Sequence, residues 1–359
     1  MLVLRVLHLV GSAVSDFYCY ISRVYAADCL KNAAISALYE SHIAYVSTDG
    51  KWYFPTSLDP SAIAAANPIS LADAVQVLAD LQIDVMVPQM YCLPGMTQYR
   101  ALFELLNIPY LGNTSEVMAL TADKAKTRAV VAAAGVSVPQ GEVLRAGDRP
   151  SIDFPVVIKP VNADNSLGVA LVKNAADYDA ALQTALTHSE EVLVEKFIEV
   201  GREVRCGIIV EAGELVCLPL EEYVLDRDRL PIRSYDEKFN PKDDGNLSLT
   251  SKPSPKSWIV DTSDPITERV WDQARKCHIA LGCRHYSLFD FRIDPDGQPW
   301  FLEAGLYCSF TPKSVLVNMT KASGVSLDTF FDSMLQKALQ GRSESPLALV
   351  TSDGKRIAR

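Results

Sequence analysis

The most informative stretch of the sequence is Phe289-Asp290-Phe291-Arg292-Ile293-Asp294-Pro295-Asp296-Gly297-Gln298-Pro299-Trp300-Phe301-Leu302-Glu303. Apolar and polar residues alternate on both sides of an Asp-Pro-Asp-Gly turn, which predicts a β-hairpin. Asp290 and Glu303 are then expected at similar heights on facing strands, where both carboxylates can bind one hard cation. Magnesium suits such a pair because it takes carboxylate and phosphate oxygens and keeps several waters. The alternative is a solvated hairpin with ordinary surface acids.

A second pattern places a lysine beside a loop of small and polar residues. Lys159 ends an expected strand at 155–159, and the loop at 162–168, which contains Ser166, leads to a strand expected at 169–173. Backbone N–H groups of such a loop can meet phosphates while the lysine supplies a positive charge. The simpler interpretation is a lysine that extends from a strand end into solvent.

The third pattern is a strand expected at 192–197 that runs into a short polar link. Such a link offers backbone groups to the edge of an adenine, and a carboxylate a few residues later can accept hydrogen bonds from ribose hydroxyls. Glu195 and Glu203 are the carboxylates concerned. Taken alone, both also fit the surface positions that glutamates usually occupy.

The order of the expected elements predicts a mixed α/β and α+β protein of several units. Strands at 2–10 and 83–88 alternate with helical patterns, which indicates a nucleotide-fold-like domain at residues 1–120. A helix at about 124–134, ended by Gly135, opens a small α+β unit at 121–200. Long strands follow in a further unit at 201–341.

Two segments lack periodicity. Residues 226–256 are rich in Asp, Lys, Pro and Ser, which is typical of a functional lid or of disorder, and residues 342–359 are expected to form a frayed tail.

Composition excludes several classes of protein. The net charge of −10 argues against a surface built to bind nucleic acid or an anionic membrane. No stretch offers the roughly 20 unbroken apolar residues that a membrane span needs, so we expect a cytoplasmic protein. The eight cysteines are scattered without a C-x-x-C pair, which indicates reduced thiols.

Together these elements resemble the ATP-grasp superfamily and, within it, the D-alanine-D-alanine ligases. The resemblance covers residues 2 to about 340 and includes the segments 105–112, 121–124 and 134–136. It implies an ATP-grasp fold with an N-terminal preATP-grasp domain, ATP and Mg²⁺ as cofactors, small-molecule substrates and a homodimer.

The resemblance also implies roles for individual residues. Lys124 and Lys159 would contact ATP phosphates or adenine, the strand with Glu195, Lys196, Phe197 and Ile198 would form the adenine hinge, and Glu203 would hold the ribose. Lys238 matches the lysine of the lid that closes over the γ-phosphate, and Asp290 and Glu303 match magnesium ligands. Such a site acts by positioning groups and neutralising charge during phosphoryl transfer.

Four departures from the ligases concern the acceptor side. The family's Glu-Ala-Asn is Glu303-Ala304-Gly305 here, and an arginine two residues before the metal aspartate is Leu288, for which Arg284 or Arg292 would have to substitute. The N-terminal substrate loop of the family corresponds to residues 10–16 here, and these residues differ from the family loop that carries an acid for the first substrate's ammonium group. The loop at 306–314 differs as well, although Ser314 keeps the place of a substrate-binding serine.

This combination looks like the mycosporine-glycine ligases of cyanobacterial sunscreen biosynthesis, through the stretches 6–12, 88–99 and 284–290. In that branch ATP activates the cyclohexenone oxygen of mycosporine-glycine, and the amino group of serine, threonine or a similar amino acid forms an imine such as shinorine or porphyra-334. A dipeptide ligase, including D-alanine-D-alanine ligase, and an ATP-binding regulatory protein with degraded catalysis are the alternatives.

For the candidate acceptor residues, the sequence is compatible both with substrate binding and with a structural role. They are Gln89, Tyr91, Gln98, Ser309, Lys313 and Ser314. Arg205 can pair with a substrate carboxylate through its planar fork or with a local acid. His285 and Cys308 fit packing better than catalysis.

Overall fold

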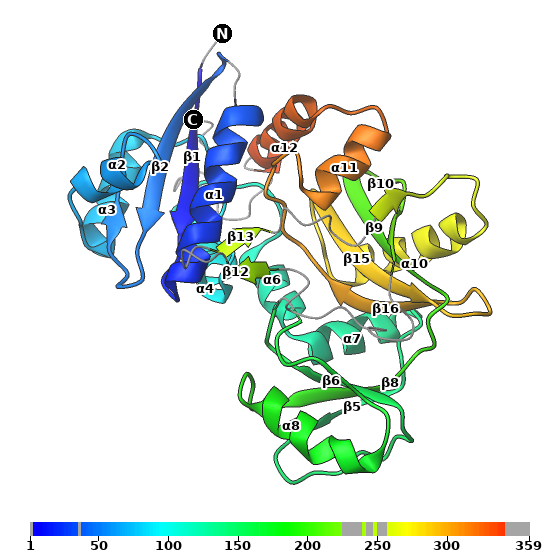
Figure 1. The fold of residues 1–359 in the computed structure, drawn as a ribbon. Coiled ribbons are helices and arrows are strands. Elements are labelled where there is room, and N and C mark those ends of the chain that lie inside the picture. The colour runs from blue at the N-terminus through cyan, green and yellow to red at the C-terminus, as the bar shows by residue number, and fades with distance from the viewer. Residues whose placement is uncertain are drawn as a thin grey trace, which may run out of the picture. The chain divides into compact units, whose positions relative to one another are not determined.

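The computed structural model describes residues 3–34, 37–164, 166–224, 239–241, 247–249 and 257–341. The chain divides into two compact units, one formed by residues 1–118 and 307–359 and the other by residues 119–306 (Figure 1). Residues 307–341, which the sequence placed with the C-terminal subdomain, thus group with the N-terminal residues. Lys238, most of the expected lid at 226–256 and the tail at 342–359 lie outside the described residues.

The first unit is built on a four-stranded sheet with the order β3-β2-β1-β4. Strands β1 (Leu4–Gly11), β2 (Tyr39–Val46) and β4 (Val85–Pro88) are parallel, and β3 (Trp52–Tyr53) pairs antiparallel with β2. Six consecutive residues at the end of β1 are buried, as expected of a parallel strand covered on both faces. The predicted parallel sheet is confirmed.

The first unit also contains seven of the described helices. They are α1 (Asp16–Asn32), α2 (Pro60–Ala65), α3 (Leu71–Leu81), α4 (Leu93–Met96), α5 (Gln98–Leu105), α11 (Val315–Ala322) and α12 (Leu327–Gly341). Helix α6 (Ser115–Ala122) spans the boundary between the units. Between α5 and α6, Tyr110 forms an isolated parallel bridge with Met86 of β4.

The second unit begins with helix α7 (Lys124–Ala133), which has the boundaries that its end signals predict. The Asp123 side chain accepts a hydrogen bond from the N–H of Lys126 and so caps the first turn. Gly135 follows the helix at a φ of 77°, the left-handed conformation that glycine adopts most easily after a helix end. Helix α7 therefore has a sequence-encoded start and stop.

A small antiparallel sheet follows, with the strand order β5-β8-β6-β7. Its strands are β5 (Gly141–Leu144), β6 (Val156–Pro160), β7 (Ala170–Val172) and β8 (Val192–Lys196). The short helix η1 (Ala175–Asp177) leads into α8 (Tyr178–Leu186), which packs on one face of the sheet (Figure 1). The strands and the helix expected in this segment are present, and they belong to the larger unit formed by residues 119–306.

The larger sheet of the second unit has the order β14-β11-β9-β15-β16, with β10 also paired to β9. Its strands are β9 (Arg202–Glu211), β10 (Glu214–Cys217), β11 (Glu221–Tyr223), β14 (Ser257–Ile259), β15 (Tyr286–Ile293) and β16 (Pro299–Ala304). Helix α10 (Ile266–Ala280) packs against the sheet, and β12 (Phe239–Pro241) pairs with β13 (Leu247–Leu249) in a separate ribbon.

Alternation along β15 gives this sheet one apolar and one polar face. The rings of Phe289 and Phe291 contact that of Phe301 on β16, and all three are buried. Asp290 and Arg292 point to the opposite face because successive strand residues alternate. The apolar face thus belongs to the core, and the polar face is available for a site.

Two other observations bear on the sequence predictions. All eight cysteines are free thiols, and six of them are buried. Within the described part of the chain, no helix is both long enough and apolar enough to cross a membrane.

The burial of His278 on α10 predicts how the stability of the protein depends on pH. His278 Nδ1 lies 2.8 Å from Ser287 Oγ, and burial lowers the pKa of His278 to about 4. Because this pKa lies below the ordinary 6.5, the unfolded chain binds the proton first. The contribution of His278 to stability is complete above pH 6.5 and is lost as pH falls toward 4, by at most about 1.4 kcal/mol per pH unit.

We therefore expect His278→Gln to lose less thermal stability than the wild type between pH 6.5 and pH 4, measured by calorimetry. The exposed His188, changed to Gln, serves as the control and should follow the wild type. Equal losses in the wild type and His278→Gln would contradict the prediction.

Candidate nucleotide and metal site

A row of four charged residues crosses the larger sheet. The strand register places Glu221 on β11 opposite Arg205 on β9, Arg205 opposite Asp290 on β15, and Asp290 opposite Glu303 on β16. Residues directly opposite each other on antiparallel strands share a face, with Cβ atoms about 4.5–5.5 Å apart. The predicted position of Asp290 and Glu303 on facing strands is confirmed.

A β-bulge is required for this alignment. Phe291 pairs with Phe301, and the preceding residue on β15, Asp290, pairs with Glu303. Leu302 is therefore an extra residue on β16 without a partner on β15. In a regular hairpin, Glu303 would share the face of Phe301, two residues away, and would point into the core. The inserted residue turns Glu303 to the face of Asp290.

Arg205 binds two carboxylates of the row. Its Nε lies 3.2 Å from Asp290 Oδ1 and its Nη1 lies 3.2 Å from Glu221 Oε2. The guanidinium also lies 5.1 Å from the centre of the Tyr223 ring. Burial lowers the pKa of Arg205, but the charges of Asp290, Tyr223 and Glu221 raise it more, and the net shift is upward. The contacts favour the local ion pair over a substrate carboxylate as its partner.

The donor set of the row fits magnesium bound together with a nucleotide. Three carboxylates and one guanidinium leave the row with a net negative charge, which favours a divalent cation. No group of three or more His, Cys, Asp and Glu side chains among the described residues is placed to hold a metal. Magnesium needs only one or two protein carboxylates when phosphates and waters supply its other ligands. Asp290 and Glu303 can provide them.

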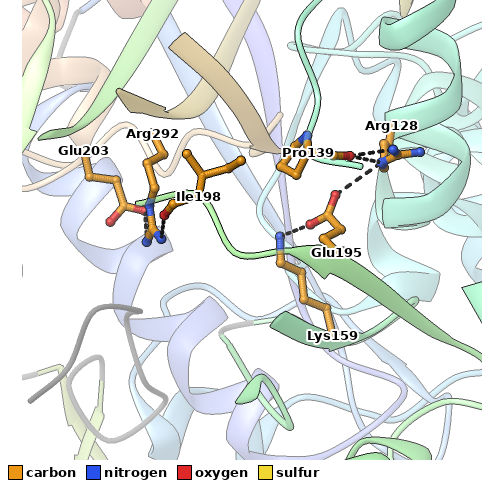
Figure 2. Close-up of polar contacts among 7 residues, drawn as sticks. All are labelled: Arg128, Pro139, Lys159, Glu195, Ile198, Glu203 and Arg292. Carbon is orange, nitrogen blue, oxygen red and sulfur yellow. Dashed lines mark hydrogen bonds and ion pairs between the residues drawn. The ribbon is translucent and has the colours of Figure 1, made fainter. Parts of the chain in front are cut away.

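A second charged pair lies next to this row. Arg292 is opposite Glu203, with Nη2 3.4 Å from Glu203 Oε1, and its Nη1 donates a hydrogen bond of 3.1 Å to the carbonyl oxygen of Ile198 (Figure 2). Its guanidinium lies 5.2 Å from the centre of the Phe197 ring. Arg292 therefore holds the link after β8. The other candidate for the missing arginine, Arg284, does not line the cavity described below.

Glu195 is the centre of a third ionic group. Lys159 Nζ lies 2.6 Å from Glu195 Oε2, and Arg128 Nε lies 3.3 Å from Glu195 Oε1 (Figure 2). Arg128 also donates two hydrogen bonds to the carbonyl oxygen of Pro139. Glu195 is buried, and two cations balance its charge. Lys159 thus points into the unit instead of extending into solvent. The sequence did not predict this role for Arg128, because an arginine within a helix pattern does not indicate which distant residue it will contact.

Two described residues of the loop between β6 and β7 have the left-handed backbone conformation that occurs in anion-binding turns. Ser166 and Gly168 both have left-handed φ values, 61° and 71°. A Cβ atom on Gly168 would lie 2.7 Å from the His188 ring and 2.9 Å from Pro160 Cγ, so only glycine fits. Lys124 Nζ donates a hydrogen bond to the carbonyl oxygen of Ala163 in the same loop.

These groups line one cavity in the second unit, with about 770 Å³ of space that opens to solvent. The predicted residues in its lining are Lys124, Lys159, Ser166, Glu195, Lys196, Ile198, Glu203, Asp290, Arg292 and Glu303. Sequence reasoning missed Pro139, Val157, Val169, Tyr223 and Leu302, which supply the apolar walls that a planar base needs. Alternation within β6 was the signal that could have identified Val157.

The candidate acceptor residues apart from Arg205 lie in the first unit. Gln89 is fully buried, with its Oε1 2.9 Å from His8 Nδ1, which favours a structural role. The Tyr91 ring makes edge contacts with the rings of Tyr25 and Tyr307. The other contacts are Ser309 Oγ to Thr311 Oγ1, 3.2 Å, and Cys308 Sγ to Ser314 Oγ, 3.5 Å, while Lys313 is exposed.

Sequence comparison matches residues 135–336 to the family model described as D-ala D-ala ligase C-terminus. A D-alanine--D-alanine ligase of Citrifermentans bemidjiense is 30% identical over 243 residues, which are 67% of this chain and 73% of that protein. A D-alanine--D-alanine ligase of Halalkalibacterium halodurans is 29% identical, over 75% of this chain and 86% of that protein. The vancomycin B-type resistance protein VanB of Enterococcus faecalis is 27% identical, over 67% and 68%.

Solved structures show the same arrangement of elements. The D-alanine-D-alanine ligase of Coxiella burnetii superposes with a TM-score of 0.75 at 20% identity, covering 95% of both chains. The VanG D-Ala:D-Ser ligase of E. faecalis gives 0.74 at 23% identity, covering 93% of this chain and 99% of that one. A Bacillus anthracis D-alanine--D-alanine ligase in complex with ATP gives 0.70 at 20% identity, covering 95% and 99%.

The charged row predicts how metal and nucleotide binding depend on single residues. Asp290→Asn and Glu303→Gln should each weaken the magnesium-dependent binding of ATP by 10-fold or more, because each removes a charged oxygen ligand. Isothermal titration of ATP at fixed magnesium concentrations measures the effect. Asp296→Asn, in the exposed turn of the same hairpin, is the matched control and should bind as the wild type. Equal affinities in all three variants would disprove the metal assignment.

Proposed function

The chain belongs to the D-alanine-D-alanine ligase family, and from this we propose that it joins an amino acid such as serine or threonine to mycosporine-glycine. Membership makes it an ATP-dependent carbon–nitrogen ligase with the ATP-grasp fold, which uses ATP and Mg²⁺. The acceptor is the part that we propose.

The chemistry of the family extends to this acceptor without a new kind of site. The cyclohexenone oxygen belongs to a vinylogous amide, because the ring carries the glycine nitrogen, and its partial negative charge lets it take the γ-phosphoryl group of ATP. The amino group of the second substrate then attacks the ring carbon, phosphate leaves with the oxygen, and loss of a proton gives the imine. Magnesium, when bound, neutralises charge on the phosphates. The protein must hold the nucleotide, align the acceptor and keep water out.

The nucleotide half of this proposal rests on the cavity in the second unit. We assign Lys124, Lys159 and Ser166 to the phosphates, and the link from Glu195 through Lys196 and Phe197 to Ile198 to adenine. Glu203 is assigned to the ribose, and Asp290 and Glu303 to magnesium. Lys159 and Arg128 neutralise Glu195, and Arg292 donates a hydrogen bond to the Ile198 carbonyl oxygen. These contacts keep the link from Glu195 to Ile198 in one conformation. Lys238 is assigned to the γ-phosphate as a lid residue.

The acceptor half rests on one local observation. Leu288 is opposite Gly207 on β9, and the N–H of Gly305 donates a hydrogen bond of 2.8 Å to the Leu288 carbonyl oxygen. Leu288 and Gly305, two of the positions that differ from the ligases, are therefore cross-strand neighbours. They share a face with Asp290, one row further along the sheet. This row lacks the arginine and the amide of the ligases that the chain resembles, which supports a different acceptor chemistry beside the proposed metal carboxylates.

Two stretches outside the nucleotide half support the same proposal. The family model matches residues 135–336, so Tyr91 lies outside the matched region. Tyr91 lies in the stretch 88–99 that resembles the mycosporine-glycine ligases, and Ser309, Lys313 and Ser314 lie in the loop whose sequence departs from the dipeptide ligases. A homodimer in the cytoplasm completes the proposal.

A D-alanine-D-alanine or other dipeptide ligase is the second candidate. The named activities of the relatives favour it, since both curated ligases described above are D-alanine--D-alanine ligases. In that case the second substrate's amine attacks an acyl phosphate and a peptide bond results.

A single assay separates the two candidates. The protein is incubated with ATP, magnesium and mycosporine-glycine with mixed amino acids, and separately with D-alanine alone. We expect an absorbance shift and a product mass of an imine in the first reaction, with no phosphate release in the second. Phosphate release with D-alanine alone and no imine would establish the dipeptide ligase. The Asp290→Asn variant is the control for contaminating ATPases.

The space around Gly305 predicts that the lost amide can be restored. A Cβ atom at Gly305 would meet nothing within 4 Å, and its φ is not left-handed. Gly305→Asn should therefore change the unfolding free energy by no more than about 0.5 kcal/mol and should lower the magnesium concentration needed for half-maximal activity. Calorimetry and a magnesium titration test both statements. A clearly destabilised variant would show that this row is closed to a side chain.

A further inference from the structure

We propose that Arg205 contacts the terminal phosphoryl group of the bound nucleotide and holds Asp290 in place beside it. This inference rests on the magnesium and ATP site proposed above, and it assigns Arg205 to the phosphoryl group instead of to a substrate carboxylate. It concerns a residue that forms an ion pair with a predicted metal ligand, Asp290.

The first argument is position. Arg205 is the only cation in the row Glu221, Arg205, Asp290 and Glu303, which the strand register sets side by side on one face. A phosphate that binds a metal at Asp290 and Glu303 comes within reach of the residue between Glu221 and Asp290, because neighbours in the row are about 5 Å apart. Arg205 is therefore in the position of a phosphate ligand.

The second argument is the use of its donors. Nε and Nη1 of Arg205 bind Asp290 and Glu221, and Nη2 has no partner among the described residues. A guanidinium can bind a carboxylate along one edge and a phosphate along another because its five N–H groups form a rigid, planar fork. The two carboxylates and the Tyr223 ring fix the plane of this fork.

The third argument concerns charge at the carboxylate pair of Asp290 and Glu303. Lys159 lies against Glu195 at 2.6 Å, and Arg292 binds Glu203 and the Ile198 carbonyl oxygen, so both of these cations pair with other groups than the metal carboxylates. The neighbouring row of Gly207, Leu288 and Gly305 carries no charge. Asp290 and Glu303 repel phosphate, so a cation beside them must offset this charge as the phosphoryl group moves. Among the described residues, Arg205 meets that need at the carboxylate pair.

The test measures nucleotide affinity and needs no acceptor substrate. Magnesium complexes of ADP and of the non-hydrolysable analogue AMPPNP are titrated calorimetrically into the wild type and Arg205→Met. We expect AMPPNP to bind about 10- to 100-fold more weakly to the variant, the range of a lost charge-assisted contact, and ADP to change by less than 3-fold. The selective loss distinguishes a phosphoryl contact from a general loss of structure.

Arg202→Met is the matched control. Arg202 lies on the same strand and also binds two carboxylates, Glu222 and Asp264. It lies three positions before Arg205, an odd step along a strand, so it is on the opposite face of the sheet from Arg205 and Asp290. This variant should bind both nucleotides as the wild type does.

The conservative variant keeps the proposal falsifiable if Arg205→Met does not fold. Arg205→Lys retains a charge without the fork, and we expect a selective loss of AMPPNP affinity of about 3- to 10-fold. Unchanged discrimination between AMPPNP and ADP in a folded variant would overturn the proposal. So would a higher KM for the amino acid with unchanged nucleotide affinity, since that result would return Arg205 to a substrate carboxylate. Failure to form the imine leaves this test untouched, because it uses nucleotides alone.

Discussion

The register between three strands of the larger sheet is the constraint on which the candidate site depends. Asp290 acquires its neighbours from pairing: Arg205 through β9 and Glu303 through β16. A slip of one residue in either pair would turn a charged side chain into the aromatic core formed by Phe289, Phe291 and Phe301. The buried rings therefore keep the carboxylates in line, and core packing and site geometry are two results of one register.

Three separate groups of ionic contacts hold charged residues of the second unit. Each of three groups combines cations and carboxylates: Lys159 and Arg128 on Glu195, Arg292 on Glu203, and Arg205 on Asp290 and Glu221. The first two lie at the assigned adenine and ribose positions, and the third lies at the assigned metal position. Pairing of this kind is necessary because an isolated charge at a buried position is costly.

Local signals in the sequence predicted local structure well. The turn residues of the 289–303 hairpin, the Asp123 cap and Gly135 specify elements within a few residues, and the structure has all three. The bulge at Leu302 left no such signal, because an inserted residue in an alternating strand reads as ordinary sequence. The contacts of Arg128 and Arg205 join residues far apart in the chain, and only folding brings them to Glu195 and Asp290. The residue types of the site were thus predictable, whereas their partners were not.

The Glu195 group has a consequence for how a nucleotide enters. Lys159 is already neutralised before any phosphate arrives, and the chain as a whole carries a net charge of −10. An approaching nucleotide, itself an anion, meets little long-range attraction. Under the proposed assignment of Lys159 to the phosphates, the nucleotide is captured at short range, where phosphate oxygens replace the Glu195 carboxylate as the partner of the ammonium group. Binding would then exchange one ionic partner for another, and its free energy would be the difference between two sets of contacts of similar strength.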